Sequence, residues 1–234
     1  MSNSIALVTG ANTGIGKEIA RQLADGGQTV YVGSRDAGRG QQAVDEIGGD
    51  TRLLVLDVTD GQSIAAAAEQ VGSLDILVNN AGILVDGATP PEAELDSFRR
   101  TYETNVFGVI AVTNAFLPAL RRCARPRIVN ISSGTGSLAW SAEGRFSMGG
   151  GAAYRSSKTA LNAVTLFYAQ ALAGDGFKVN AMAPGLRRTG LNPRAAASDG
   201  DPAEAAAGAV RLALLGDDGP TGEFLSWDLT PVPW

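Results

Sequence analysis

Short apolar runs alternate along this chain with longer stretches of helical periodicity. The runs predicted as strands are 5–9, 29–34, 53–58, 74–78, 127–131, 178–182 and 223–226. The stretches predicted as helices are 14–25, 36–47, 60–71, 92–102, 105–122, 152–172 and 201–215. Strands that are apolar on both faces and alternate with helices indicate a parallel sheet covered on both sides, with right-handed crossovers. We therefore expect an α/β fold, a single doubly wound domain over residues 1–234 whose sheet has about seven strands.

Glycines and polar residues follow the predicted strands at the points where these end. In open α/β sheets the ligand binds beyond the carboxyl ends of the strands. The residues found there are Gly10–Gly16, Ser34–Arg35, Asp57–Val58, Asn80–Gly82, Ser133 and Pro184–Gly185. This placement favours one site built from many strand ends over a set of unrelated surface residues.

The composition excludes several classes of function. The chain has no histidine and one cysteine, Cys123, which excludes Ser-His-Asp and Cys-His catalysis, histidine-containing metal sites and an internal disulfide. A formal net charge of -5 without a Lys/Arg block argues against nucleic-acid binding. The start of the chain lacks the basic segment of a signal peptide, and no apolar run approaches the length that spans a bilayer. We expect a cytoplasmic protein with no metal, no nucleic-acid partner and no membrane partner.

The stretch from Thr9 to Gly16, TGANTGIG, joins the first predicted strand to the first predicted helix. Gly10 permits a tight turn, Gly14 lets the backbone approach a phosphate, and Gly16 permits close packing of helix on strand. The helix N-terminus offers N–H groups to a pyrophosphate. The spacing differs from the usual G-x-G-x-x-G fingerprint, and a structural turn without a ligand is the alternative. The context predicts a Rossmann-type dinucleotide site that includes Gly10, Asn12, Thr13, Gly14, Ile15 and Gly16.

The residues after the second and third strands predict the choice of cofactor. Ser34 stands where a carboxylate would accept from a ribose 2′-hydroxyl and favour NAD, and Arg35 follows it. A guanidinium suits a 2′-phosphate, so the pair predicts NADP(H); a solvated arginine is the alternative. Asp57 is predicted to accept from the adenine amino group, with capping of the next helix as its alternative.

Tyr154 and Lys158 lie four residues apart in the predicted helix 152–172, so their side chains share one face. An ammonium group beside a phenol stabilises the phenolate. A shift of about 3 pKa units, roughly 4 kcal/mol, would let the tyrosine exchange protons near neutral pH. With a serine hydroxyl nearby, the pair can protonate a carbonyl or deprotonate an alcohol. The isolated pattern also fits an ordinary helix surface, and the strand-end residues elsewhere favour the catalytic interpretation.

Together these motifs resemble the short-chain dehydrogenase/reductase family. The matching segments run in family order over nearly the whole chain: Thr9–Gly16, Asp57–Val58, Asn79–Gly82 (NNAG), Asn105, Ser133, Tyr154–Lys158 (YRSSK) and Pro184–Gly185 with Thr189. The stretches Ser34–Gln41 and Gly222–Trp234 are most similar to the carbonyl-reductase branch.

The resemblance implies a role for each matched residue. Tyr154 is the general acid/base, Lys158 lowers its pKa and binds the nicotinamide ribose, and Ser133 hydrogen-bonds the substrate carbonyl. Ser132 is the rival of Ser133, and strand alternation alone does not choose between them. Asn105 supports a water that links Lys158 to solvent, with a helix-starting cap as its alternative. The other implied cofactor contacts, from the adenosine ribose to the nicotinamide, are Val58, Asn80, Ala81, Gly82, Pro184, Gly185, Arg187 and Thr189.

Two segments depart from the family pattern and are expected to handle the substrate. Segment 134–151 separates Ser133 from Tyr154 by more residues than usual, and segment 186–201 is shorter than the usual lid. The apolar residues predicted to line the substrate pocket are Trp140, Phe146, Met148, Leu186 and Leu191. Ordinary loop packing is the alternative for each of them.

The predicted function is NADPH-dependent reduction of a ketone, aldehyde or quinone carbonyl of a small apolar molecule, with Tyr154 as general acid/base. The alternatives are a reductase acting on an imine or enone, and an NADPH-binding sensor on the same fold. Segment Val106–Leu120 is apolar almost all round, and the Tyr154 helix has a face of small residues. We therefore expect a homodimer or tetramer.

Overall fold

A computed structural model describes residues 4–146 and 150–234 and places a seven-stranded parallel sheet at the centre of the chain. The strands are β1 (Ile5–Val8), β2 (Thr29–Ser34), β3 (Thr51–Val55), β4 (Ile76–Asn79), β5 (Arg127–Ile131), β6 (Lys178–Ala183) and β7 (Phe224–Ser226). Their order is β3-β2-β1-β4-β5-β6-β7, so the direction of winding reverses between β1 and β4. Val8 pairs with Val32 of β2 and with Val78 of β4, which brings the residues after these strands to one edge.

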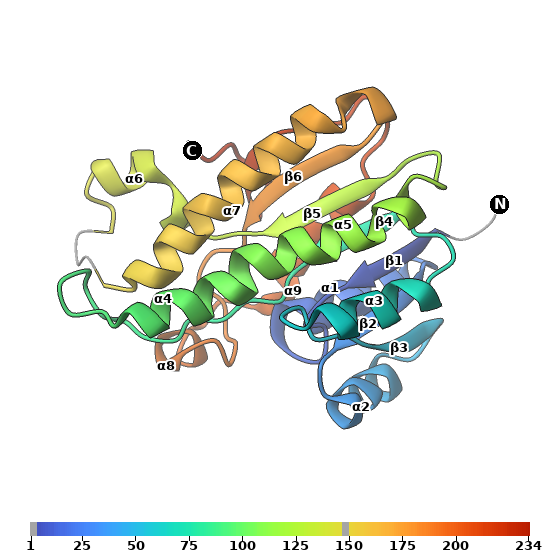
Figure 1. Cartoon of the computed structure of the whole chain (residues 1–234), viewed down its shortest axis with the longest axis horizontal. Coiled ribbons are helices and arrows are strands. Elements are labelled where there is room, and N and C mark those ends of the chain that lie inside the picture. The colour runs from blue at the N-terminus through green and yellow to red at the C-terminus, as the bar shows by residue number, and fades with distance from the viewer. Residues whose placement is uncertain (1–3, 147–149) are drawn as a thin grey trace.

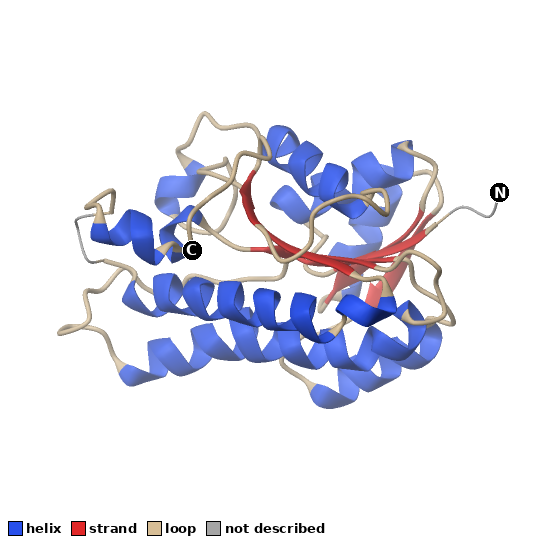
Figure 2. Cartoon of the chain, turned by 90° about the horizontal axis from the view of Figure 1, so that it is seen from above, coloured by secondary structure: helices blue, strands red, loops and turns tan. Residues whose placement is uncertain are grey.

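Helices cover both faces of the sheet, as predicted (Figures 1 and 2). They are α1 (Gly14–Asp25), α2 (Ala37–Ile47), α3 (Gly61–Gln70), α4 (Leu95–Tyr102), α5 (Gly108–Leu120), α6 (Leu138–Ala142), α7 (Ala152–Ala171), α8 (Pro193–Ala196) and α9 (Pro202–Ala213). Side chains alternate along β1: Ala6 and Val8 pack in the layer of α1 and α9, whereas Leu7 packs in the layer of α3 and α5. This alternation buries both faces of the central strands and explains their continuous apolar character.

Some predicted boundaries were wrong. Strand β3 ends at Val55 rather than at position 58, because the Asp57 carboxylate accepts from the backbone N–H of Thr59 and turns the chain toward α3. Helix α4 begins at Leu95 rather than at position 92. Both predicted substrate loops contain a short helix, α6 in the first and α8 in the second.

The two helices predicted at 92–102 and 105–122 form one continuous helix. A π-helical turn, Glu103–Phe107, joins α4 to α5 without a break in helical backbone geometry. Asn105 lies inside this turn and is fully buried, so the alternative that it caps a helix start is wrong. Single π turns inside α-helices occur frequently at functional sites.

The continuous helix, Leu95–Leu120, is 26 residues long with a mean hydropathy of 1.2 in its most apolar window. By length and composition alone it could cross a membrane, contrary to the sequence expectation. However, 56% of that window is buried inside the protein. Val112 and Phe116 pack into the core between the sheet and α3, and this packing accounts for the apolar sequence.

Candidate active site

A cleft of about 440 Å³ opens at the carboxyl ends of the strands, where the strand order reverses. The predicted cofactor residues that line it are Gly10, Asn12, Thr13, Gly14, Ile15, Gly16, Ser34, Arg35, Asp57, Val58, Asn80, Ala81, Gly82, Tyr154, Lys158, Pro184 and Thr189. The sequence analysis missed Arg39, Thr59, Ile83 and Thr104, which also line it. The cleft has the size typical of a cofactor site.

The glycine turn leaves room and hydrogen-bond donors for a phosphate. Gly10 and Gly14 have φ of 61° and 58°, in the left-handed region that strains other residues. At Gly16 an added Cβ would lie 2.3 Å from the amide nitrogen of Asn80. Within the described residues, the side chain of Thr13 does not cap α1, so the N–H groups of its first turn remain open to the cleft. These residues fit the pyrophosphate of a nicotinamide dinucleotide.

Asn80 braces this turn. Its side-chain nitrogen donates to the carbonyl oxygens of Thr9 at 2.9 Å and Gly10 at 3.2 Å. The hydroxyl of Thr9 in turn accepts from the backbone N–H groups of Asn80 and Ala81. The ends of β1 and β4 are thus tied together, and the amide of Asn80 holds the turn in shape besides lining the cleft.

The residues after β2 form a basic end of the cleft. Ser34 is 2% exposed, and its hydroxyl donates to the carbonyl of Asp36 at 2.8 Å. Arg35 is exposed, and Arg39, in the first turn of α2, lines the same end. The signal for Arg39 in the sequence was a second arginine four residues after Arg35. Two guanidinium groups are therefore available where the sequence analysis assigned one.

Asp57 does not cap helix α3, so that alternative is wrong. Its carboxylate accepts from the backbone N–H and hydroxyl of Thr59, at 2.9 and 2.7 Å. The helix is capped instead by Asp60, which accepts from the N–H of Gln62. Asp57 stays on the cleft wall, and its contact with adenine remains a prediction.

Tyr154 and Lys158 project from successive turns of α7 into the other end of the cleft. The ammonium nitrogen of Lys158 lies 5.7 Å from the centre of the Tyr154 ring and donates to the carbonyl of Ile131, the last residue of β5, at 2.8 Å. The residue Lys158 is only 4% exposed. The end of β5 therefore holds the ammonium group beside the phenol.

Asn105 joins three elements behind this pair. Its side-chain oxygen accepts from the N–H of Ile83 at 2.9 Å, and its nitrogen donates to the carbonyl of Ile83 and to the hydroxyl of Ser157, both at 3.0 Å. A Cβ added to Gly82 would lie 3.4 Å from this oxygen and 3.5 Å from the Lys158 nitrogen. The π turn thus places Asn105 next to Lys158.

The structure distinguishes the two serines that end β5. Ser132 is 2% exposed, and its hydroxyl donates to the side-chain oxygen of Asn162 at 2.5 Å. The hydroxyl of Ser133 lies 2.9 Å from that of Thr135 and is close enough to Tyr154 to lower the pKa of its phenol. This arrangement favours Ser133 as the partner of Tyr154.

The pKa values of the pair move in opposite directions. Burial raises the pKa of Tyr154 to about 12, and the hydrogen bond from Ser133 lowers it by less. Burial lowers the pKa of Lys158 to about 8. The expected lowering of the Tyr154 pKa by Lys158 is not found in this arrangement, in which the ammonium group is directed at the Ile131 carbonyl. At neutral pH Tyr154 is therefore protonated and able to donate a proton.

Two predicted cofactor residues do not line the cleft. Arg187 is 8% exposed; it pairs with Glu204 at 3.0 Å and its guanidinium lies 4.5 Å from the centre of the Trp227 ring. Gly185 precedes it in the turn, with φ of 71°. Thr189, by contrast, lines the cleft. Its methyl group lies next to the glycine turn, 3.3 Å from the place where a Cβ on Gly14 would be.

The predicted substrate residues lie in different places. Leu191 lines the cleft, whereas Leu186 is 49% exposed. Trp140 and Phe146 form an aromatic pair with ring centres 6.4 Å apart, and Trp140 packs on a small core cluster. Met148 lies outside the described residues.

Comparisons with known proteins agree with this fold. The chain matches the family model for short chain dehydrogenases over residues 4–199. It is 38% identical over 248 residues to the short-chain dehydrogenase/reductase ATR10 of Stachybotrys chlorohalonatus (strain IBT 40285), covering 97% of this chain and 89% of that protein. It is 33% identical over 293 residues to salutaridine reductase of Papaver bracteatum, covering 94% and 93%. The structure of NADPH-bound carbonyl reductase from chicken fatty liver has a TM-score of 0.88 and 28% identity, covering 100% of both chains.

The chain belongs to the short-chain dehydrogenase/reductase family. It is accordingly an oxidoreductase acting on CH–OH and C=O groups of small molecules with a nicotinamide cofactor.

Proposed function

We propose that this protein is an NADPH-dependent reductase of ketone, aldehyde or quinone carbonyls on small apolar molecules. The observation that carries the proposal is the meeting of Tyr154, Ser133, Lys158 and Asn105 beside a cleft that fits a dinucleotide. A dinucleotide sensor would need the cleft but not this group of residues, so the enzyme is the better account.

The four residues divide the chemistry among them. Tyr154 donates its proton to the carbonyl oxygen, and the hydroxyl of Ser133 donates a hydrogen bond to the same oxygen as negative charge develops there. The ammonium of Lys158, 5.7 Å from the centre of the ring, turns from the Ile131 carbonyl toward the phenolate that remains and stabilises it during the proton transfer. Asn105 positions a water that returns a proton toward Lys158. When bound, NADPH supplies the hydride for the carbonyl carbon.

The basic end of the cleft favours NADPH over NADH. Ser34 provides no carboxylate to repel a 2′-phosphate, and Arg35 and Arg39 provide fixed positive charges. A hydrogen bond to a charged partner contributes about 1.5–3 kcal/mol, which corresponds to a preference of about 10- to 150-fold. Arg35 is the stronger candidate because Arg39 also lies near the Asp36 carboxylate, at 4.0 Å.

The test is oxidation of NADPH and NADH with a panel of ketones, aldehydes and quinones. We expect carbonyl-dependent oxidation of NADPH, weaker NADPH binding in Arg35→Ala with NADH binding nearly unchanged, and a reversed preference in Ser34→Asp. Arg99→Ala is the matched control, because Arg99 is an exposed arginine on α4 outside the cleft. NADPH binding without turnover would identify a sensor, and equal weakening of both cofactors in Arg35→Ala would reject Arg35 as the discriminating residue.

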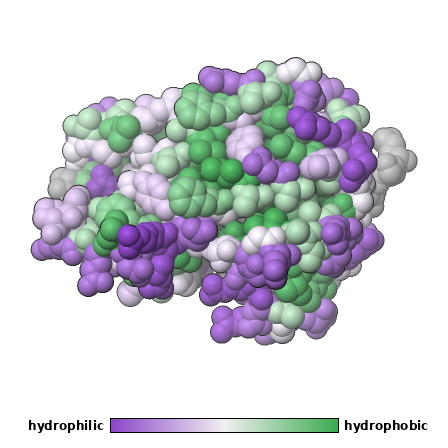
Figure 3. All heavy atoms as spheres, viewed as in Figure 1, coloured by the Kyte–Doolittle hydropathy of each residue, from purple (hydrophilic) through white to green (hydrophobic). Residues whose placement is uncertain are grey.

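We also propose that the protein is a homodimer or tetramer. Phe107 is 53% exposed next to α5, and Phe167 on α7 is 61% exposed. Figure 3 shows apolar surface gathered over the face on which α5 and α7 lie. Burying such a patch against a second copy would remove it from water. A monomeric mass by light scattering at micromolar concentration would contradict this proposal.

A further inference from the structure

The last residues of the chain return to the segment that carries Ser133. After β7 the chain turns back, and Val232 donates to the carbonyl of Phe224 at 2.8 Å. Leu229 in this turn has φ of 68°, and it is the one residue other than glycine with positive φ in the described parts of the chain. Such a conformation is strained and persists where surrounding contacts hold it. Both views place the end of the chain beside α6 (Figures 1 and 2).

The tail, residues 231–234, is bonded to the first turn of α6. Ser137 is fully buried, and its hydroxyl donates to the carbonyl of Pro233 at 2.5 Å. The backbone N–H of Ala139 donates to the carbonyl of Trp234 at 3.0 Å. The Trp234 ring stacks on Phe224, with ring centres 5.5 Å apart and 27° between the planes. Stacking on β7 and two hydrogen bonds to α6 therefore fix the position of the tail.

The same turn of α6 supports the serine of the active site. The hydroxyl of Ser137 also accepts from the N–H of Trp140 at 3.1 Å, which caps α6. The Trp140 ring lies against Gly134, the neighbour of Ser133, where an added Cβ would lie 2.9 Å from it.

On its other side, the short turn after Ser133 packs on the helix of Tyr154. A Cβ on Gly136 would lie 2.8 Å from the backbone of Lys158. The carbonyl of Gly136 accepts from the hydroxyl of Thr159 at 2.8 Å. Ser133 thus begins a turn that is held between α7 and the tail-supported helix α6.

We propose that the tail is a positioning element of the active site: it holds α6 and the turn 134–136 so that Ser133 stays beside Tyr154. The inference rests on the proposed carbonyl reductase function. The tail does not line the cofactor cleft, so its effect falls on the carbonyl and not on the dinucleotide. Trp234 and Ser137 act through Ser133 and are positioning residues.

The first test is the kinetics of Trp234→Ala, with acetophenone and benzophenone as a small and a large ketone. We expect kcat to fall about 10-fold, because small displacements of a catalytic group are costly, while the Kd for NADPH stays within about 2-fold. Trp234→Phe should restore kcat, since phenylalanine can stack on Phe224. Leu214→Ala is the control, because Leu214 is another large apolar residue that is 47% exposed. Unchanged kcat in Trp234→Ala, or equal losses of NADPH affinity and kcat, would overturn the proposal.

The second test does not require turnover. Hydrogen exchange of wild type and Trp234→Ala is followed at residues 133–142, with strand β1 and helix α3 as internal references. We expect faster exchange at 133–142 alone and recovery in Trp234→Phe. Unchanged exchange there would overturn the inference whatever the activity. A wild type that reduces no carbonyl while the exchange effect is present would reject the proposed function and leave the structural coupling in place.

Discussion

Two buried cations lie at opposite ends of strand β5 and have very different surroundings. Arg127 begins the strand and is 2% exposed, whereas Lys158 is 4% exposed and donates to Ile131, with which the strand ends. A buried charge is costly unless it is paired and hydrogen-bonded. The two ends of this strand meet that requirement to different extents, and only one of them lines the cleft.

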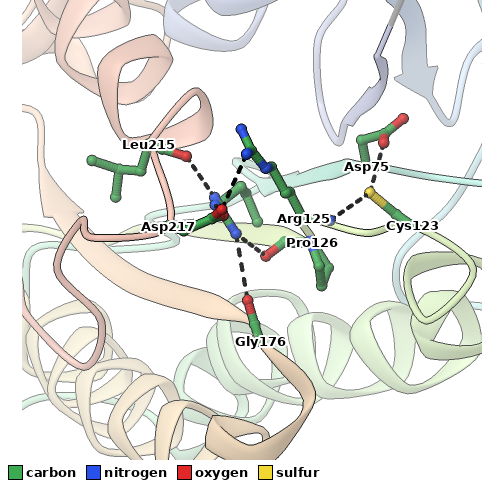
Figure 4. Close-up of polar contacts among 8 residues, drawn as sticks. Asp75, Cys123, Arg125, Pro126, Gly176, Leu215 and Asp217 are labelled. Carbon is green, nitrogen blue, oxygen red and sulfur yellow. Dashed lines mark hydrogen bonds and ion pairs between the residues drawn. The ribbon is translucent and has the colours of Figure 1, made fainter. Parts of the chain in front are cut away.

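The amino end of β5 is fully paired (Figure 4). The guanidinium of Arg127 bonds to the Asp217 carboxylate at 3.2 Å and to three backbone carbonyls, those of Leu215, Pro126 and Gly176. Beside it the thiol of Cys123 donates to Asp75 at 2.6 Å, and burial raises the pKa of this thiol to about 11. These contacts tie β5 to neighbouring loops and leave no polar group of Arg127 ready for chemistry.

At the carboxyl end, by contrast, the ammonium of Lys158 has one carbonyl acceptor, and its pKa is lowered to about 8 by burial. No carboxylate pairs with it in the parts of the chain that the structure describes. A charged group held under such conditions destabilises the folded state, and groups of this kind cluster at functional sites. The sheet therefore places a stabilising cation at one end of β5 and a chemically available cation at the other.

The largest expected effect is on the activity of Lys158→Met. At saturating NADPH we expect kcat for a ketone to fall by about 100- to 10,000-fold, because the phenolate of Tyr154 loses its stabilising charge. The matched variant Arg127→Met should keep kcat within about 3-fold, since Arg127 is remote from the cleft. Similar losses of kcat in both variants would break the comparison.

Arg127→Met, which should leave kcat nearly unchanged, should lower the stability of the protein. In Arg127→Met the guanidinium, itself 2% exposed, no longer donates to Asp217 and to the carbonyls of Pro126, Leu215 and Gly176, and we expect the free energy of unfolding to fall by about 2–4 kcal/mol. For a chain of this length that corresponds to a melting temperature lower by about 5–12 °C. Differential scanning calorimetry measures it directly. An unchanged melting temperature would show that the amino end is not the scaffold described here.

The pH dependence of stability sharpens the contrast. Because the pKa of Lys158 is about 8 in the folded protein and about 10.5 when unfolded, the unfolded chain binds more protons between these values. Burial of the charged ammonium group therefore lowers the stability of the fold by its full amount below pH 8, and this loss of stability disappears as the pH rises toward 10.5. We therefore expect the free energy of unfolding of Lys158→Met, measured in urea, to exceed that of wild type by about 2–3 kcal/mol more at pH 7 than at pH 10. A difference between variant and wild type that does not depend on pH would contradict the lowered pKa.

The local parts of the site were predictable from sequence. The glycine turn, the helix that presents Tyr154 and Lys158, and the strand ends that meet at the cleft follow from short-range patterns and from the rule that ligands bind beyond parallel strands. The parallel sheet with helices on both faces was likewise confirmed. These features depend on residues close together in sequence, or on the sheet as a whole.

The features that sequence did not predict depend on distant partners. The π turn at Asn105 is accompanied by bonds to the backbone of Ile83, 22 residues earlier. Arg187 does not line the cleft because it pairs with Glu204 and packs on the ring of Trp227, which lie on later segments. None of these three partners is marked by spacing or composition, so only the folded structure reveals them.

In the proposed mechanism Tyr154 donates the proton at the carboxyl edge of the sheet. The most direct measurement compares Tyr154→Phe with wild type in NADPH-dependent ketone reduction, together with the Kd for NADPH. Phenylalanine keeps the ring and removes only the hydroxyl. We predict that kcat falls by at least about 100-fold while NADPH binding is retained. Near-normal turnover of Tyr154→Phe would contradict the account.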